Sequence, residues 1–184
     1  MKPLEVPFLA DLVQIRRDIH AHPELAFQEE RTAELVAREL ASYGLEVNCG
    51  IAGTGVVATL RQGSSSRAIG LRADMDALPL HEKNDFPHRS QNDGRMHACG
   101  HDGHTAILLG AARYLAEHRH ELDFNGAVRF IFQPAEESEG GAEVMIRDGL
   151  FARFPMDAVF GLHNWPGIPL GAMAVMPGPV MAGT

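Results

Sequence analysis

A nine-residue run near the middle of the chain concentrates side chains that bind metal ions. Residues 96–104 (MHACGHDGH) contain three histidines, one cysteine and one aspartate. Cys99 and His101 are two positions apart, so in an extended segment their side chains leave the same face. A thiolate beside an imidazole suits a borderline divalent ion such as Zn²⁺, Mn²⁺, Co²⁺ or Ni²⁺. The alternative is a buried structural cysteine among surface histidines, but the density of histidines favours a metal site.

Two adjacent glutamates follow a strongly apolar run. Glu136 and Glu137 lie in QPAEESE, directly after residues 127–132 (AVRFIF). Neighbouring side chains in an extended or turning segment point apart, so one carboxylate can bind a metal ion while the other accepts a proton from water. Metal-assisted hydrolysis needs this division, since the metal lowers the pKa of its bound water toward ~7. The alternative is a solvated pair or the first turn of a helix.

Two further polar groups also come directly after apolar runs. His163 follows residues 158–162; alone it would be typical of a hydrogen-bonded core histidine, but beside the other clusters it is interpreted as a ligand. Asp74 and Asp76 follow residues 68–72 and share one face of an extended stretch. They are either metal ligands or carboxylates that orient a ligating imidazole, and the residues alone leave both possibilities open.

The elements that must position these side chains form an α/β pattern. Helical periodicity covers residues 9–19, 32–43 with Thr32 as the N-cap, and 103–117. Short β-rich runs predict strands at residues 45–49, 55–60, 68–72, 127–132, 158–162 and 171–176, and a short helix at 143–147. Strands that alternate with helices predict a mainly parallel sheet flanked by helices. The polar groups then lie at strand ends, where open α/β sheets place their sites.

The composition excludes several classes of protein. The chain has 184 residues, of which 45% are hydrophobic and 22% charged, as in ordinary globular domains. A net charge of −8 argues against a nucleic-acid partner. The absence of an apolar run of ~18 residues argues against a membrane span. Cys49 and Cys99 are too few for a disulfide framework, so we expect a cytoplasmic protein.

Four of these segments, in this order and spacing, resemble the M20 metallopeptidases: LRADMDALP, MHACGHDGHTA, FQPAEE and GLHNWP. The chain is most similar to the amidohydrolase branch, which includes hippurate hydrolases, N-acyl-amino-acid amidohydrolases and plant auxin-conjugate hydrolases. Residues 20–29 (HAHPELAFQE) also match the opening of that branch. The resemblance covers essentially the whole chain. It implies a zinc-exopeptidase-like catalytic domain that hydrolyses the amide bond of N-acyl amino acids through a metal-activated water.

The resemblance also implies a role for each matched residue. It implies two divalent metal ions, with a bridging cysteine sulfur and the ligands Cys99, His101, Glu137 and His163. Glu136 would be the general base, and Asp76 would match the family's supporting aspartate. Asp74 stands where other branches carry a histidine ligand, so it is left out of the ligand set. The other residues expected to support the ligands are Asp102, His97 and His104.

The resemblance further implies a longer enzyme. The family's catalytic domain is interrupted by a lid, or dimerisation, domain that would begin after residues 178–184 (GPVMAGT). Residues 1–184 are then expected to form the N-terminal part of the catalytic metal-binding domain. The lid, the rest of the catalytic domain, a last histidine ligand and an oxyanion-stabilising histidine would lie elsewhere, and the full-length enzyme could form a homodimer. Two alternatives stay open: a non-catalytic metal-binding module, and a cysteine hydrolase that uses Cys99.

Overall fold

The computed structural model describes residues 6–137 and 139–179. Within them the chain forms one five-stranded sheet and two groups of helices. The elements follow in the order α1 (Leu9–Ala21), α2 (Glu30–Ser42), β1 (Glu46–Ile51), β2 (Gly55–Gln62), β3 (Ala68–Asp74), α3 (His101–Glu117), β4 (Gly126–Gln133), α4 (Gly141–Arg147), α5 (Leu150–Arg153) and β5 (Ala158–Gly161). None of the helices in this described part is both long and apolar enough to cross a membrane.

The sheet is mixed, with the strand order β1-β2-β4-β3-β5. β1 and β2 form an antiparallel pair joined by a short turn, and β2 is also antiparallel to β4. β3 is parallel to both β4 and β5, because helices connect these strands along the chain. The predicted α/β class with helices flanking the sheet is confirmed, and the parallel pairs are those formed by β3.

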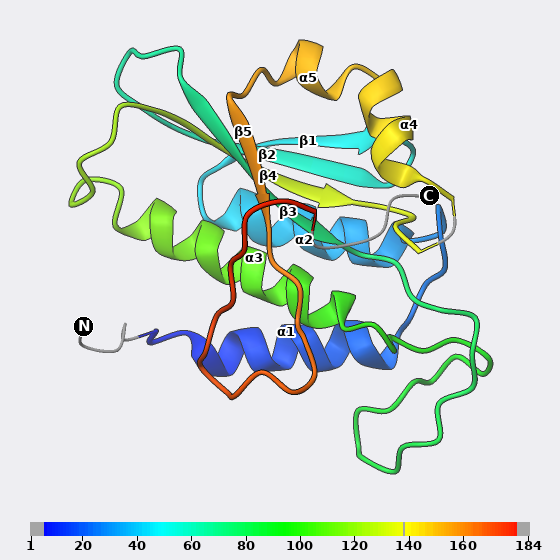
Figure 1. Ribbon diagram of the computed structural model, residues 1–184. Coiled ribbons are helices and arrows are strands. Elements are labelled where there is room, and N and C mark those ends of the chain that lie inside the picture. Colours follow the sequence, from blue (N-terminus) through cyan, green and yellow to red (C-terminus); the bar gives the residue numbers. More distant parts are fainter. Residues whose placement is uncertain (1–5, 138, 180–184) are drawn as a thin grey trace.

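Helices cover both faces of the sheet (Figure 1). α1, α2 and α3 lie on one face, where the larger apolar cluster includes Leu40, Leu109 and Phe130. α4 and α5 lie on the other face over a smaller cluster that includes Ile51 and Met145. Every residue of β4 is buried, because this central strand lies between the two layers.

The parallel strands set the position of the polar segments. In the parallel register Asp74 pairs with Gln133, and Arg72 pairs with Gly161. The carboxyl ends of β3, β4 and β5 therefore meet at one edge of the sheet, and α3 begins at His101 beside them. The polar residues that follow these strands therefore lie close together, although Asp74 and His163 are 89 positions apart along the chain.

The last predicted strand is wrong. Residues 171–176 form a turn followed by irregular chain, and all of them are exposed. A strand needs the edge of a neighbouring strand with which to exchange hydrogen bonds. Residues 171–176 have no such pairing among the described residues, so their β-rich composition does not produce a strand.

The apolar run at residues 158–162 is typical of a buried strand, but β5 is exposed. Val159 and Phe160 are 44% and 56% exposed. β5 lies at the edge of the sheet and pairs only with β3 in the described structure, and neither helix layer extends over it (Figure 1). An apolar sequence therefore predicted the strand correctly but not its burial.

Candidate metal centre

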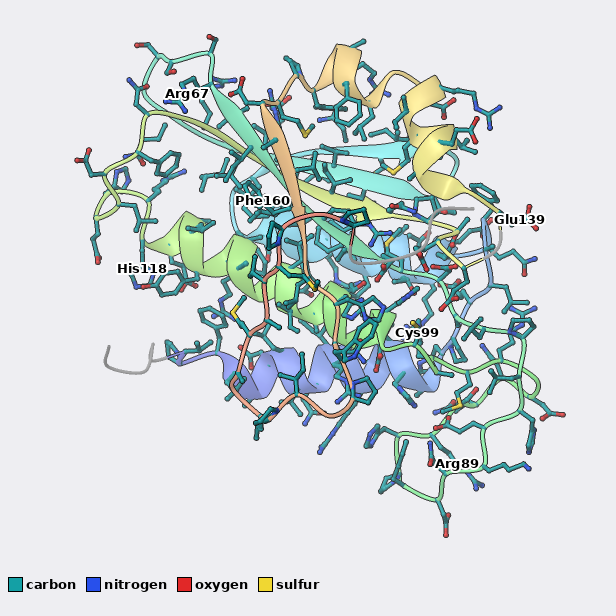
Figure 2. All side chains as sticks on the ribbon, in the orientation of Figure 1. Arg67, Arg89, Cys99, His118, Glu139 and Phe160 are labelled. Carbon is teal, nitrogen blue, oxygen red and sulfur yellow. The ribbon has the colours of Figure 1, made fainter. Side chains whose placement is uncertain are left out.

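The structure brings the four polar segments together at the start of α3, near the residue labelled Cys99 in Figure 2. Among the described residues, three groups of side chains have potential ligand atoms within 4.8 Å of one another. The groups are Cys99, His101 and His163; Asp74, His101 and His104; and His101, Glu136 and Glu137. His101 belongs to all three groups, so it lies at the centre of the cluster.

His101 is held with one ring nitrogen free. It is fully buried at the first position of α3, where Gly100 precedes it with a left-handed φ of 102°. Its Nδ1 lies 3.0 Å from Asp76 Oδ1, and because the carboxylate can only accept, Nδ1–H is the donor. The other nitrogen, Nε2, is buried and has no hydrogen-bond partner within residues 6–137 and 139–179. A buried lone pair without a partner is available to a cation.

Asp76 orients two of the predicted ligands at once. Its Oδ1 accepts the hydrogen bond from His101, and its Oδ2 accepts the backbone N–H of Glu137 at 3.0 Å. Burial alone would raise the pKa of Asp76, but these hydrogen bonds hold the pKa below its ordinary value. Asp76 therefore stays charged and fixes the His101 tautomer, which is how a carboxylate behind a ligating histidine acts.

The prediction that the two glutamates point apart is wrong, because both side chains converge on His101 and their carboxylate oxygens there lie within 4.8 Å of each other. Glu137 Oε1 lies 3.7 Å from His101 Nε2 and is buried without a hydrogen-bond partner in the described structure. Glu136 Oε2 also lies 3.7 Å from His101 Nε2, but its side chain is 40% exposed against 22% for Glu137. Glu137 thus faces the buried centre, while Glu136 reaches the same centre from the solvent side.

Cys99 and His163 complete the outer side of the cluster. Cys99 Sγ lies 3.4 Å from His163 Nε2. Burial, followed by the neighbouring Glu137 carboxylate, raises the pKa of the Cys99 thiol to about 12. The thiol is therefore protonated at neutral pH unless cations offset the surrounding carboxylates. Reactive nucleophilic cysteines have lowered pKa values, so this environment does not suit a cysteine hydrolase.

The residues fit a divalent metal ion. Two buried ligand atoms, His101 Nε2 and Glu137 Oε1, have no hydrogen-bond partner among the residues that the structure describes, and they face each other at 3.7 Å. Atoms that bind one ion at ~2.1 Å lie roughly 3–4 Å apart, which matches this spacing. The sulfur, nitrogen and oxygen donors suit borderline divalent ions. The nearby carboxylates also give the cluster an excess of negative charge.

Asp74 and His104 form a buried pair beside this centre. Asp74 Oδ1 accepts a hydrogen bond from His104 Nδ1 at 2.7 Å, and Arg72 Nη1 donates to Oδ2 at 2.6 Å. Burial alone would raise the pKa of Asp74, but these two partners lower it to about 2. His104 Nε2 lies 2.5 Å from Asn164 Oδ1. With both of its oxygens hydrogen-bonded, Asp74 stays outside the ligand set that we propose.

Asp102 and His97 lie on another side of the first turn of α3. Asp102 Oδ2 accepts hydrogen bonds from His20 Nδ1 at 2.9 Å and Arg16 Nε at 3.1 Å. Neither of these two partners is a predicted metal ligand. His97 is buried, and burial lowers its pKa to about 4, which keeps it neutral. Both residues lie near the site, and their support of the ligands remains a prediction.

His20, Glu29 and Asn164 also form hydrogen bonds near the site, although the sequence assigned them no role. They lie in HAHPELAFQE and GLHNWP, so the matched motifs were the only signal that could have found them. Their partners are 82, 106 and 60 positions away along the chain, too far for local spacing to reveal.

The comparison with known families decides the membership of this chain. The model of peptidase family M20/M25/M40 matches residues 70–180, which include Asp74, Cys99, His101, both glutamates and His163. The chain belongs to this family. The M20 membership predicted from the four motifs is therefore confirmed.

Individual M20 relatives are similar over most of this chain. The hippurate hydrolase of Campylobacter jejuni is 53% identical over 165 residues, which cover 88% of this chain and 42% of that protein. The N-acyl-L-amino acid amidohydrolase of Geobacillus stearothermophilus is 47% identical over 174 residues, covering 94% of this chain and 46% of that protein.

A solved structure shares the fold and the family. The Bacillus subtilis YXEP protein, described as a dinuclear metal-binding peptidase from the M20 family, matches with a TM-score of 0.88 and 42% identity. The match covers 96% of this chain and 48% of that one. The chain thus spans less than half the length of each of these three proteins.

Proposed function

We propose that this M20 chain supplies the metal-binding part of an amidohydrolase that cleaves N-acyl amino acids. The observation that carries the proposal is the buried Nε2 of His101, which has no hydrogen-bond partner in the described part of the chain and has carboxylate oxygens of Glu136 and Glu137 each 3.7 Å away. The relatives named hippurate hydrolase and N-acyl-L-amino acid amidohydrolase support this class of substrate.

Four side chains would hold two divalent ions: Cys99, His101, Glu137 and His163. Zn²⁺, Mn²⁺, Co²⁺ and Ni²⁺ all suit this donor set. When bound, such ions polarise the scissile carbonyl and lower the pKa of water toward ~7. Asp76 keeps the proton of His101 on Nδ1, so Nε2 remains a ligand throughout the reaction.

Glu136 would move the proton. Its partly exposed carboxylate accepts a proton from the attacking water and later donates it to the leaving nitrogen. The carbon–nitrogen bond breaks, and the products are a carboxylic acid and an amino acid with a free α-amino group. Glu137 faces the buried centre, so it is not placed for this exchange.

The extent of the enzyme belongs to the same proposal. Residues 1–184 would be the first part of the catalytic metal-binding domain, with a lid domain and further ligands supplied by a longer polypeptide. The match to only 42–48% of the related proteins supports this arrangement. The homodimer and the cytoplasmic location remain predictions; the second is supported because both Cys49 and Cys99 are free thiols.

A substrate panel before and after metal removal tests the proposal. The full-length protein is incubated with N-benzoylglycine, N-acetylcysteine and other N-acetylated amino acids, and the free amino acid is measured. We expect release that stops after dialysis against a chelator and returns with added Mn²⁺ or Co²⁺. Release that survives chelation but stops after alkylation of Cys99 would support the cysteine hydrolase instead. Metal binding without release from any substrate would support a metal-binding module.

A further inference from the structure

The N-terminal motif at residues 20–29 (HAHPELAFQE) supplies none of the proposed ligands, yet it contacts three segments of the site. The His20 side chain hydrogen-bonds to the first turn of α3. The Glu24 carbonyl accepts a backbone N–H from the segment after β3, at 2.8 Å. The Glu29 side chain accepts one from the turn after β4, at 2.9 Å. The motif therefore contacts the site through hydrogen bonds, although the proposed reaction gives it no role.

Glu29 is the most unusual of these three residues. It is fully buried at the N-cap position of α2, but its side chain makes no capping hydrogen bond to that helix. Acidic and small polar N-cap residues are favoured because they accept the free N–H groups of the first turn. Here Glu24 does so, accepting the N–H groups of Arg31 at 3.0 Å and Thr32 at 2.9 Å. The N-cap expected at Thr32 is thus wrong, and the Glu29 carboxylate is directed elsewhere.

That carboxylate holds the turn that carries the two glutamates. Glu29 Oε1 accepts the backbone N–H of Ala135 at 2.9 Å, and Oε2 accepts the hydroxyl of Thr54 at 2.6 Å. Ala135 is buried and has a φ of 53°, a left-handed conformation that residues other than glycine rarely adopt. Such a strained conformation persists only where the surroundings enforce it.

Ala135 directly precedes Glu136 and Glu137, so its backbone conformation sets the directions of both side chains. We infer that Glu29 is a positioning residue that holds Ala135 in the left-handed conformation and thereby aims Glu136 and Glu137 at the metal centre. The inference rests on the proposed function for the roles of those two glutamates. The hydrogen bond from the Ala135 N–H to Glu29 is also present in the metal-free protein.

Two substitutions at position 29 separate the hydrogen bond from the charge. Glu29→Met keeps the length but removes both acceptors. Glu29→Gln keeps an acceptor for the Ala135 N–H, and its NH₂ group can donate to the Thr54 hydroxyl. In the full-length protein we expect Glu29→Met to weaken Co²⁺ binding about 10- to 100-fold, the usual effect of losing a partner behind the ligands. Glu29→Gln should stay within about threefold of the unsubstituted protein, because its hydrogen bonds are retained.

A second substitution tests the route through Ala135. Glycine adopts a positive φ without strain. Adding Ala135→Gly to Glu29→Met should therefore recover most of the Co²⁺ affinity and the visible absorption spectrum. Leu40→Ala, a core change in the same helix, is the matched control; it destabilises the fold but should leave the Co²⁺ affinity unchanged. If Glu29→Met does not fold, Glu29→Asp, which withdraws the carboxylate by one methylene, takes its place.

Hydrogen exchange in the metal-free protein provides a readout that does not depend on the proposed chemistry. The Ala135 amide should exchange faster in Glu29→Met than in Glu29→Gln. Any of three results would overturn the inference. The Ala135 amide could exchange at the same rate in Glu29→Met and Glu29→Gln, Glu29→Met could bind Co²⁺ as tightly as the unsubstituted protein, or Ala135→Gly could fail to restore Co²⁺ binding. Unchanged Co²⁺ binding in a protein that hydrolyses N-acyl amino acids would overturn the role of Glu29 alone. Absence of hydrolysis with the expected exchange and Co²⁺ results would overturn only the proposed function.

Discussion

The inner and outer sides of the metal centre are built very differently. Asp76, His101 and His104 are at most 3% exposed; His101 is hydrogen-bonded to Asp76, and His104 to Asp74. His163 is exposed and follows β5, which pairs with one strand only in the described part of the sheet. The inner side is therefore determined by its own buried contacts, whereas the outer side depends on an edge strand and on the contacts of His163 with Cys99 and of Asn164 with His104.

The largest expected effect comes from the group that reaches the centre from solvent. Glu136→Gln keeps the size of the side chain but cannot accept the proton from water. We expect kcat to fall about 10²- to 10⁴-fold, the usual contribution of a general base. Metal content should not change, because the inner ligands are untouched. The matched control is Glu139→Gln, an exposed neighbour that should retain activity (Figure 2). Full turnover in Glu136→Gln would remove this residue as the base.

An apolar residue of the central strand β4 and one of the edge strand β5 should contribute differently to the free energy of unfolding. Phe130 on β4 is fully buried, whereas Phe160 on β5 is 56% exposed. Phe130→Ala should lower the free energy of unfolding by about 3–5 kcal/mol, because it removes a core side chain and leaves a cavity. Phe160→Ala should change it by less than about 0.5 kcal/mol, as surface substitutions usually do. Urea unfolding of both variants measures the difference, and equal losses would show that β5 is covered.

The hydrogen bonds behind the ligands should also differ between the two sides. Asp76→Asn removes the charged acceptor that orients His101 and the Glu137 backbone, so metal affinity should fall about 10- to 100-fold. Asn164→Ala on the outer side leaves the hydrogen bond between His104 and Asp74 intact, so the loss of metal affinity should be smaller. Competition with a chromophoric chelator measures both affinities. A larger loss for Asn164→Ala would reverse the comparison.

The pH dependence of metal binding follows from the protons that the ligands carry. Burial lowers the pKa of His101, but Asp76 and the neighbouring carboxylates raise it overall above its ordinary value, and the Cys99 thiol has a pKa of about 12. Both groups must lose a proton to bind a cation. Affinity should therefore fall as pH drops through the raised pKa of His101, by about tenfold per pH unit for each proton released. Calorimetry in two buffers measures those protons, and constant affinity from pH 8 to 5 would contradict the ligand set.

The sequence predicted the parts of the molecule that depend on local pattern. The strands around Phe130 and Val57 and the helix that contains Leu109 follow from periodicity, and the family motifs identified the residues that gather around His101. Burial of β5 could not be predicted, because an apolar run does not reveal whether another layer covers it. The function of Glu29 could not be predicted either, since its hydrogen bond depends on a turn 106 positions away.

X-ray absorption spectroscopy of the full-length, Zn²⁺-loaded protein measures the ligands of the proposed centre. We expect a sulfur scatterer at ~2.3 Å from Cys99, nitrogen and oxygen scatterers at ~2.0–2.2 Å, and a second metal ion nearby. The sulfur signal should disappear in Cys99→Ser. A spectrum with nitrogen and oxygen ligands only, unchanged by Cys99→Ser, would contradict a dinuclear centre built on Cys99, His101, Glu137 and His163.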